Sequence, residues 1–296
     1  MKLETLICND KFIYLIGFIW ADGHLNKSIT SLSFSTTEKD MEYLLPLAIE
    51  IFPHGKLYKI KKRKESWQQC YSFNINDTIL CKELFNLDYR EKSSITPSKI
   101  LNIIPNNKHY LFWMGYFDGD GTLRVKKNIN SCSVEISICS TYEQDWNSLA
   151  NLSKNLNIPK FRIKKEISKL GHKCSKFIFE DLISSITFLK YIYKSEYSLP
   201  RKRETFKDIL NYIEDYLLKN LTCHKWINGK NIVIVDIDKR RYSVARCSSY
   251  FDGFKAKIRF CKLHNSKLYK LFKLHPIRKQ IILSYFKTLP CNHNCH

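Results

Sequence analysis

The stretch Phe12-Ile-Tyr-Leu-Ile-Gly-Phe-Ile-Trp-Ala-Asp-Gly-His-Leu25 recurs 98 residues later as Tyr110-Leu-Phe-Trp-Met-Gly-Tyr-Phe-Asp-Gly-Asp-Gly-Thr-Leu123. Each copy has a glycine, a small residue four positions later, an aspartate and a second glycine. The matched pairs are Gly17 and Gly115, Ala21 and Gly119, Asp22 and Asp120, and Gly23 and Gly121. Repetition at a fixed spacing indicates a duplicated structural unit.

The residues after each copy change from strand-like to helix-like patterns in the same order. Apolar and polar residues alternate at 32–35 and again at 133–138, as in a half-buried strand. The first unit is expected to continue with a helix over 38–52, strands near 56–62 and 69–75 and a helix over 77–86, and the second with a helix over 143–156, strands near 161–165 and 173–179 and a helix over 182–193. The alternative, two unrelated α+β domains that share a short stretch by chance, does not explain why the flanking patterns agree.

The two repeated stretches are predicted to be buried helices that pack against each other. Residues 12–20 and 111–117 are apolar nearly all round, so neither helix can face water. Side chains four apart share one helix face, so the matched glycine and the small residue after it form a stripe. Two facing stripes allow close backbone contact. Such contact would bring the two C-terminal ends together, and there lie Asp22 and Asp120.

Asp22 and Asp120 are therefore candidate metal ligands. The helix dipole disfavours an acid at a C-terminal end, and two acids brought together repel each other. A divalent metal between them is the natural compensation. Two carboxylates that bridge two or three hard cations suit phosphodiester hydrolysis, in which one metal activates water and another stabilises the leaving oxygen. The glycine after each acid, Gly23 or Gly121, is expected in a left-handed turn that ends the helix.

The charge and composition of the chain indicate a polyanionic partner. There are 49 Lys+Arg against 28 Asp+Glu, a net charge of +21, and an excess of this size favours binding to nucleic acid, with an anionic membrane surface as the alternative. No apolar run approaches the roughly 18–20 residues of a membrane span, so we expect no membrane partner. The eleven irregularly spaced cysteines suit reduced thiols in an intracellular protein better than a disulfide framework.

At its two motifs the sequence resembles the LAGLIDADG family. Leu15-Ile-Gly-Phe-Ile-Trp-Ala-Asp-Gly23 and Trp113-Met-Gly-Tyr-Phe-Asp-Gly-Asp-Gly121 match the family signature, and the resemblance covers roughly residues 10–210. It implies an α+β fold of two pseudo-symmetric αββαββα subdomains, in which the motif helices form the interface and two saddle-shaped antiparallel sheets lie in the major groove. One position departs from the family pattern. The family often has an acid there, as the second copy has Asp118, but the first copy has Trp20. The position is largely structural.

The resemblance also implies a function and a set of site residues. The expected activity is that of a monomeric homing endonuclease, which uses Mg²⁺ to make a staggered double-strand cut at a long asymmetric DNA site. The last acid of each motif binds metal in this family, which corresponds here to Asp22 and Asp120. The other residues expected to take part are Ala21 and Gly119, whose carbonyls join the metal ligands, Lys92 and Lys202, which stabilise developing charge, and Gln144, which orients water.

Alternating polar residues on the expected strands are candidates for DNA contact. A two-stranded antiparallel ribbon fits the major groove and presents alternate side chains to base edges. The basic candidates are Lys59, Lys61 and Arg63, which alternate with Tyr58 and Ile60, and Arg124, Lys126, Arg162 and Lys164; the uncharged ones are Ser31, Ser33, Ser35, Ser72 and Asn74. Arginine and asparagine could read bases, and most lysines would contact phosphate. A merely solvated sheet face is the alternative for each of them.

The last part of the chain does not continue the duplication. We expect subdomains at 1–105 and 106–212, followed by a basic accessory module at 213–296 that binds nucleic acid. From residue 211 onward there are 17 Lys+Arg and 5 Asp+Glu, a local charge of +12. The pattern predicts a hairpin at 232–235 and 242–247, a strand at 254–261 and helices at 266–274 and 276–286.

Two other functions are compatible with the same fold. A maturase that binds intron RNA would suit the basic module, because some family members assist the splicing of their own intron. The second alternative is a non-catalytic DNA-binding regulator. The loss of one acid would have indicated it, but Asp22 and Asp120 are both present. The bias toward Asn, Ile and Lys is compatible with an organelle, phage or viral origin.

Overall fold

The computed structural model describes residues 1–62, 64–128, 131–158, 160–167, 171–180, 182–220, 226–227, 230–237 and 240–247. Residues 1–209 form one compact unit and residues 210–296 another. The strand and the two helices expected beyond residue 250 lie outside the described residues.

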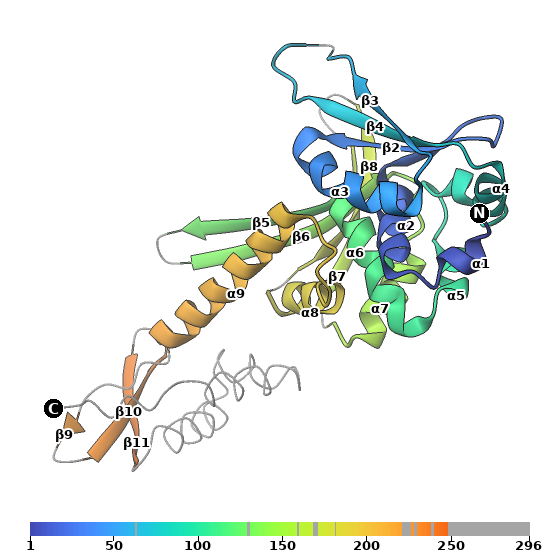
Figure 1. The fold of residues 1–296 in the computed structure, drawn as a ribbon. Coiled ribbons are helices and arrows are strands. Elements are labelled where there is room, and N and C mark those ends of the chain that lie inside the picture. The colour runs from blue at the N-terminus through green and yellow to red at the C-terminus, as the bar shows by residue number, and fades with distance from the viewer. Residues whose placement is uncertain are drawn as a thin grey trace. The chain divides into compact units, whose positions relative to one another are not determined.

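The first half of unit 1 contains the predicted order of helices and strands (Figure 1). Its elements are α1 (Leu3–Leu6), α2 (Asp10–Asp22), β1 (Gly23–Leu25), β2 (Leu32–Thr37), α3 (Glu38–Ile51), β3 (Lys56–Ile60), β4 (Cys70–Ile75) and α4 (Thr78–Asn86). The short elements η1 (Tyr89–Glu91), α5 (Ser98–Ile103) and η2 (Asn106–Lys108) lead to the second half.

The second half repeats this order. Its elements are α6 (His109–Asp120), β5 (Gly121–Asn128), β6 (Ser131–Thr141), α7 (Asn147–Asn155), β7 (Phe161–Ile167), β8 (Lys173–Phe179), α8 (Leu182–Ile192) and α9 (Pro200–Asn220). Helix α7 begins four residues later than expected, and just before it the carboxylate of Asp145 accepts a hydrogen bond from the Asn147 N–H at 2.8 Å. Helix α9 was not predicted; it starts with Pro200, whose fixed φ suits a first helical position.

The two halves contain sheets with the same strand order. The order is β1-β2-β4-β3 in the first and β5-β6-β8-β7 in the second, and all neighbouring strands are antiparallel. One face of each sheet is apolar and buried, as at Phe34 and Phe73 in the first sheet and Ile138 and Phe177 in the second. The predicted α+β fold of two αββαββα units is therefore confirmed.

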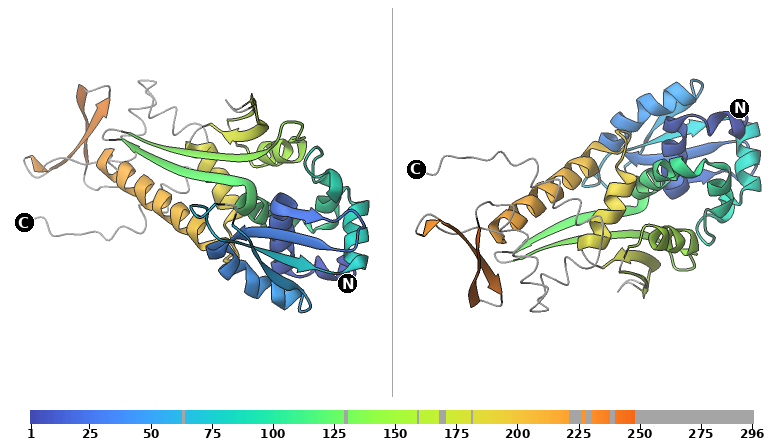
Figure 2. Two further views of the ribbon diagram at one scale, coloured as in Figure 1. Left: turned by 90° about the horizontal axis from the view of Figure 1, so that it is seen from above. Right: turned by 90° about the horizontal axis from the view of Figure 1, so that it is seen from below.

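The motif helices α2 and α6 lie side by side, and their backbones touch. Figure 2 shows, from above and below, the strands of the two halves on either side of this pair. A Cβ atom added to Gly17 would lie 2.1 Å from the carbonyl oxygen of Phe112, and one added to Gly115 would lie 2.0 Å from that of Tyr14. Only glycine fits at such distances, so the predicted contact between small-residue stripes is confirmed.

The glycines that follow the two acids are not in left-handed turns, and this prediction was wrong. Gly23 (φ −88°, ψ 165°) and Gly121 (φ −79°, ψ 141°) are extended, because each is the first residue of a strand. Space is the reason for glycine at these positions. A Cβ atom would lie 2.4 Å from the carbonyl oxygen of Ile19 at the first, and 2.2 Å from that of Phe117 at the second.

Unit 2 contains a small antiparallel sheet in its described part. Its strands are β9 (Trp226–Ile227), β10 (Lys230–Ile237) and β11 (Arg240–Cys247), in the order β11-β10-β9. The predicted hairpin of 232–235 with 242–247 is confirmed by the pairing of β10 with β11. Among all helices that the structure describes, none combines the length and the apolar character that crossing a bilayer requires.

Candidate active site

The ends of α2 and α6 bring Asp22 and Asp120 together. A Cβ atom on Gly119, next to Asp120, would lie only 3.2 Å from the Asp22 carboxylate. Burial raises the pKa of Asp22 above its ordinary value. Burial, and then the negative charge of Asp22, raise the pKa of Asp120 from 3.8 to about 7. Burial thus disfavours the charged form of both carboxyl groups, and the charge of Asp22 adds to this effect at Asp120.

Lys92 and Lys202 lie beside this pair and cap the two motif helices. The Lys92 ammonium donates to the carbonyl oxygens of Trp20 and Ala21, both at 2.6 Å. The Lys202 ammonium donates to the carbonyl oxygens of Phe117, Asp118 (2.8 Å) and Gly121 (2.7 Å). Positive charge at a helix C-terminus is favourable because the helix dipole is negative there.

The two lysines also act on the acids electrostatically. Their positive charges oppose the rise in the pKa of both Asp22 and Asp120. Burial in turn lowers the pKa of Lys92, and it lowers that of Lys202 to about 8. The structure thus places both lysines next to the acids, as the resemblance implied, although their hydrogen bonds go to the backbone. Their catalytic role stays a prediction.

Gln144 has a different environment from the one expected. Its amide nitrogen donates to the carbonyl oxygens of Ile95 (2.8 Å) and Asp145 (3.1 Å), and its amide oxygen accepts from the hydroxyl of Ser140 (2.8 Å). The side chain is buried. Its polar atoms are thus engaged by protein groups, and it joins the segment after η1 to the second half rather than presenting its amide to water.

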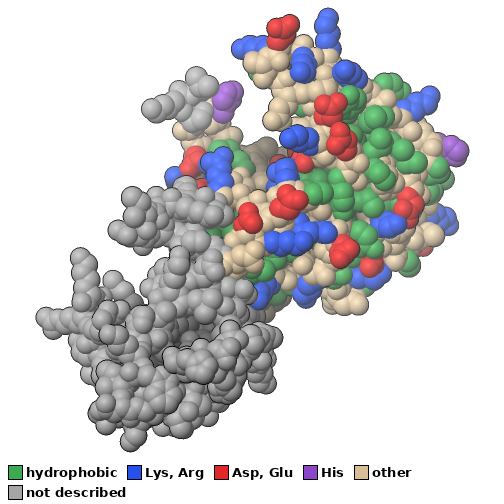
Figure 3. All heavy atoms as spheres, turned by 60° about the vertical axis from the view of Figure 1, so that its left-hand side comes forward, with side chains coloured by type: hydrophobic (Ala, Val, Ile, Leu, Met, Phe, Trp, Pro, Cys, Tyr) green, Lys and Arg blue, Asp and Glu red, His purple; other side chains and the backbone are tan. Residues whose placement is uncertain are grey.

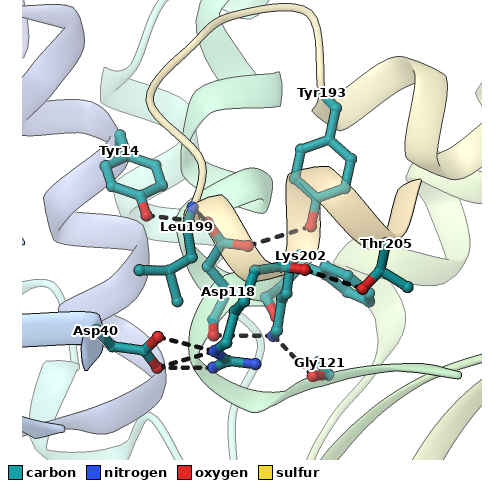
Figure 4. A network of polar contacts seen from close by, with 10 residues as sticks. Tyr14, Asp40, Asp118, Gly121, Tyr193, Leu199, Lys202 and Thr205 are labelled. Atoms are coloured by element: carbon teal, nitrogen blue, oxygen red, sulfur yellow. Dashed lines mark hydrogen bonds and ion pairs between the residues drawn. The ribbon is translucent and has the colours of Figure 1, made fainter. Parts of the chain in front are cut away.

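Asp118 is the centre of a buried polar network that sequence reasoning missed (Figure 4). Its carboxylate accepts hydrogen bonds from the hydroxyls of Tyr14 (2.9 Å) and Tyr193 (3.2 Å) and from the Leu199 N–H (2.6 Å). Burial raises the pKa of Asp118. In the first copy this place is taken by Trp20, which is also buried. The acid therefore has a structural role, as expected for this motif position.

The connection before α9 ties the two halves together and positions Lys202. Arg201 donates to both carboxylate oxygens of Asp40 in α3, with shortest distances of 2.8 Å to each (Figure 4). The hydroxyl of Tyr43 in α3 donates to the carbonyl oxygen of Glu196 at 3.0 Å. Arg201 and Asp40 are far apart in the sequence, so no local signal could have identified this pair.

Strand pairing places the uncharged DNA-contact candidates of the first sheet on one face. Ser33 pairs with Asn74 and Ser35 pairs with Ser72, so these four side chains share the face opposite Phe34. Ser31 lies in the turn just before β2. This face is polar over two neighbouring strands, as the DNA-contact prediction requires.

The basic residues of β3 do not follow the predicted pattern. Lys59 pairs with Tyr71, and so lies on the same face as Leu57 and the buried Phe73. Tyr58 and Ile60 lie on the polar face instead, because they pair with Ser72 and Cys70. The expected division was wrong because β3 is an edge strand whose residues are all exposed, so their polarity does not reveal their face. Lys61 follows the end of β3, and Arg63 lies outside the described residues.

The basic candidates of the second sheet do share one face. Arg162 pairs with Ile178 and Lys164 with Lys176, on the face opposite Phe177. By the same alternation, Arg124 pairs with Glu135 in β6 and so lies on the same face as Arg162 and Lys164. The side chain of Lys126 lies outside the described part of the structure.

Several of these basic residues have acidic partners within the protein. Glu166 lies 2.5 Å from Lys164 and 2.8 Å from Lys176, and hydrogen bonds from both lysines lower its pKa to about 2. Arg162 pairs with Glu180 at 3.1 Å. Figure 3 shows acidic side chains lying among the lysines and arginines of the described surface. The second sheet is thus a mixed-charge surface, so a polyanion would have to compete with these acids.

The raised pKa of Asp120 predicts a pH-dependent stability. A carboxyl whose pKa is raised on folding contributes stability below its unfolded pKa, here 3.8, and that contribution is lost as the pH rises through about 7. In EDTA, the Tm gain from Asp120→Asn should therefore be larger at about pH 8 than at about pH 5, by a few degrees. Differential scanning calorimetry measures both. Glu42→Gln, the same charge change on the exposed side of α3, is the control. An equal gain in Tm from Asp120→Asn at both pH values would contradict the raised pKa of Asp120.

Comparisons with known proteins give matches only among solved structures. No family model and no curated protein matches this chain. The LAGLIDADG homing endonuclease I-GzeII, in complex with its DNA target, is 12% identical with a TM-score of 0.44, over 71% of this chain and 92% of that chain. The LAGLIDADG meganuclease I-AabMI, bound to uncleaved DNA, is 16% identical with a TM-score of 0.43, over the same shares. Full-length DUF199/WhiA from Thermatoga maritima is 15% identical with a TM-score of 0.39, over 73% and 72%.

Proposed function

We propose that this chain is a homing endonuclease of the LAGLIDADG type, which cuts both strands of DNA with divalent metal bound by Asp22 and Asp120. The observation that carries the proposal is the meeting of the two carboxylates at the ends of α2 and α6, where an added Cβ on Gly119 would lie 3.2 Å from the Asp22 carboxylate. Near neutral pH two neighbouring carboxylates need positive charge close to them, since burial and then the charge of Asp22 raise the pKa of Asp120 to about 7.

The donor atoms at the pair suit Mg²⁺. Carboxylate and carbonyl oxygens are the ligands that this hard cation prefers. In the part of the chain that the structure describes, no three His, Cys, Asp or Glu side chains gather in one place, so backbone oxygens would have to complete the ligand set. The carbonyl of Gly119 is the first candidate, since that of Ala21 accepts a hydrogen bond from Lys92. Bound divalent metal lowers the pKa of the attacking water and stabilises the leaving oxygen.

The residues around the pair would then assist a reaction at phosphate. Lys92 and Lys202 hold positive charge beside the carboxylates, where it stabilises negative charge that develops on the phosphate group. The Asp40–Arg201 contact fixes the start of α9 and with it Lys202. Each half of the chain supplies one acid and one lysine, so a single chain has a set for each strand of a duplex and would act as a monomer.

The polar sheet faces are the proposed DNA-binding surface. Ser33, Ser35, Ser72 and Asn74 would contact base edges from the first sheet. Arg124, Arg162 and Lys164 would act from the second, where phosphates would replace the acidic partners of Arg162 and Lys164. The net charge of +21 favours association with DNA and predicts a strong dependence on salt.

Selection from a randomised double-stranded DNA library tests this function. The full chain is incubated with the library in Mg²⁺ and, as a control, in EDTA, and cleaved ends are sequenced. We expect one long asymmetric site, cut on both strands only with Mg²⁺. A chain that binds DNA or RNA tightly yet never cuts would contradict the nuclease, and its binding preference would then distinguish a maturase from a DNA-binding regulator.

A further inference from the structure

A pocket with a volume of about 260 Å³ lies at the end of the first sheet, where the loop between β3 and β4 begins and ends. Figure 1 shows this loop projecting beyond the two strands. Ile60 and Trp67 contribute the large apolar side chains of the pocket, and Lys61 and Lys62 its positive charge. None of these side chains takes part in the proposed metal site.

Trp67 is unlike the other tryptophans whose side chains the structure describes. Its side chain is 51% exposed, whereas Trp20, Trp113 and Trp146 are buried. A large exposed aromatic ring indicates a binding surface, because its apolar faces gain free energy only when something covers them. Ile60, next to it in the pocket, is 39% exposed.

The loop is anchored in a way that presents Trp67 at a defined place. The side-chain amide of Gln69 donates to the carbonyl oxygens of Ile60 and Cys70, both at 2.8 Å, and so joins the ends of the two strands. The Trp67 N–H donates to the carbonyl oxygen of Lys64 at 3.1 Å within the loop. These hydrogen bonds hold the backbone on both sides of Trp67, so less loop ordering is required when a ligand binds.

The charge of the loop selects an anionic ligand with a flat apolar part. Residues 61–69 contain four basic side chains and one acidic side chain, a net charge of +3. Ser35 and Gln68 add polar side chains to the lining. A nucleotide has the matching features, which are a planar base, hydrogen-bonding groups at its edge and a phosphate.

The pocket is continuous with the proposed DNA-binding face. Ser35 belongs to both, and Ile60 lies on the polar face through its pairing with Cys70. DNA that lies along Ser33 and Asn74 would therefore reach the pocket at the end of the sheet.

We propose that this pocket binds one nucleobase of the bound DNA that has left the base stack, with its ring against Trp67 and its phosphates on Lys61 and Lys62. The proposal rests on the proposed function only for DNA as the partner and does not depend on cutting. A base outside the stack has free faces and edges, which this pocket can cover. Fully paired DNA offers neither to the pocket.

Binding in EDTA tests the proposal with the full chain. The probes are a mixed-sequence duplex and the same duplex with a single-stranded overhang, and affinity is measured by fluorescence anisotropy. Stacking on an aromatic side chain is worth about 1–3 kcal/mol per base. Trp67→Ala should therefore weaken binding of the overhang duplex about tenfold and binding of the paired duplex less than twofold, while Trp67→Phe should keep most of the affinity.

Two matched controls separate the pocket from the rest of strand β3. Tyr58→Ala removes another exposed aromatic side chain, which does not line the pocket, and should leave the preference for the overhang unchanged. Lys62→Gln should reduce that preference, whereas Lys59→Gln, on the opposite face, should not.

Three results would overturn the proposal. Trp67→Ala could weaken both duplexes equally, which would make it a general contact, or it could weaken neither. The full chain could bind oligouridylate at least tenfold more tightly than oligothymidylate, with the difference lost in Trp67→Ala. This result would assign the pocket to RNA. The binding test is done in EDTA, so a chain that fails to cut DNA in Mg²⁺ can still show the expected binding. Failure of the pocket proposal is therefore distinguishable from failure of the nuclease proposal.

Discussion

Replacing Asp120 by asparagine is expected to lower double-strand cutting of the selected DNA site by about a thousandfold or more, and Asp22→Asn should do the same. Each substitution removes one carboxylate of the pair and with it negative charge that would hold divalent metal under the proposed function. Metal catalysis contributes several kcal/mol to stabilisation of the transition state, and each 1.4 kcal/mol corresponds to about tenfold in rate. Single-turnover cleavage in Mg²⁺, with both strands labelled, measures the effect.

The stability of the same variants excludes unfolding as the cause. Asp120→Asn removes a raised pKa and should increase the Tm at about pH 8 while activity is lost. Glu42→Gln, on the exposed side of α3, removes the same charge and should cut at the wild-type rate. Retention of wild-type cutting by either aspartate variant would contradict the assignment of that acid as a metal ligand.

Replacing Gly115 by valine is expected to prevent stable folding of residues 1–209, and Gly115→Ala to lower the Tm by about 3–10 °C. Even the Cβ atom of alanine would lie 2.0 Å from the carbonyl oxygen of Tyr14, so α2 and α6 would have to separate. Overpacking of a close-packed interface costs about 1–3 kcal/mol, and each kcal/mol corresponds to about 2–4 °C in a domain of this size. Alanine favours helix over glycine, so any loss must come from the contact itself.

The effect of Gly115→Ala should extend to the two acids, and this separates it from ordinary destabilisation. Movement of the helices would move Asp22 away from Asp120, so cutting should fall even at temperatures where the variant is folded. Gly171→Ala is the control, because Gly171 has a positive φ of 79° but no atom within 4 Å of an added Cβ. It should cost about 1–2 kcal/mol through backbone strain and leave cutting unchanged. Wild-type stability of Gly115→Ala would contradict the close helix contact.

Local patterns in the sequence were sufficient for the order of elements. Hydrophobic periodicity located most helices and strands of both halves, although not α5 or α9, and β8 was predicted residue for residue at 173–179. The repeated glycine and small residue predicted the contact of α2 with α6, because spacing of four places both on one helix face. The same repeat identified Asp22 and Asp120 as a pair, since two helices that touch along such stripes end at the same place.

Local patterns failed wherever a partner strand or a distant segment decides on which face a side chain lies or what it contacts. Lys59 was assigned to the wrong face because an exposed edge strand has no hydrophobic alternation, and only the pairing with β4 determines which side chains share a face. Gln144 was expected to meet water, but Ile95 and Ser140 engage its amide. Neither contact leaves a signal in the neighbouring residues.

The sequence by itself therefore determined the duplicated fold, the buried motif helices and the two acids at their ends, because each follows from a pattern within one short stretch that recurs 98 residues later. Only the tertiary structure decided what surrounds the acids. It places Lys92 and Lys202 on the backbone carbonyls of the motif helices and Asp118 in a network with Tyr14. Those contacts join segments that are some 70 to 100 residues apart, and burial at their meeting point, which no single segment encodes, is what raises the pKa values of the acids.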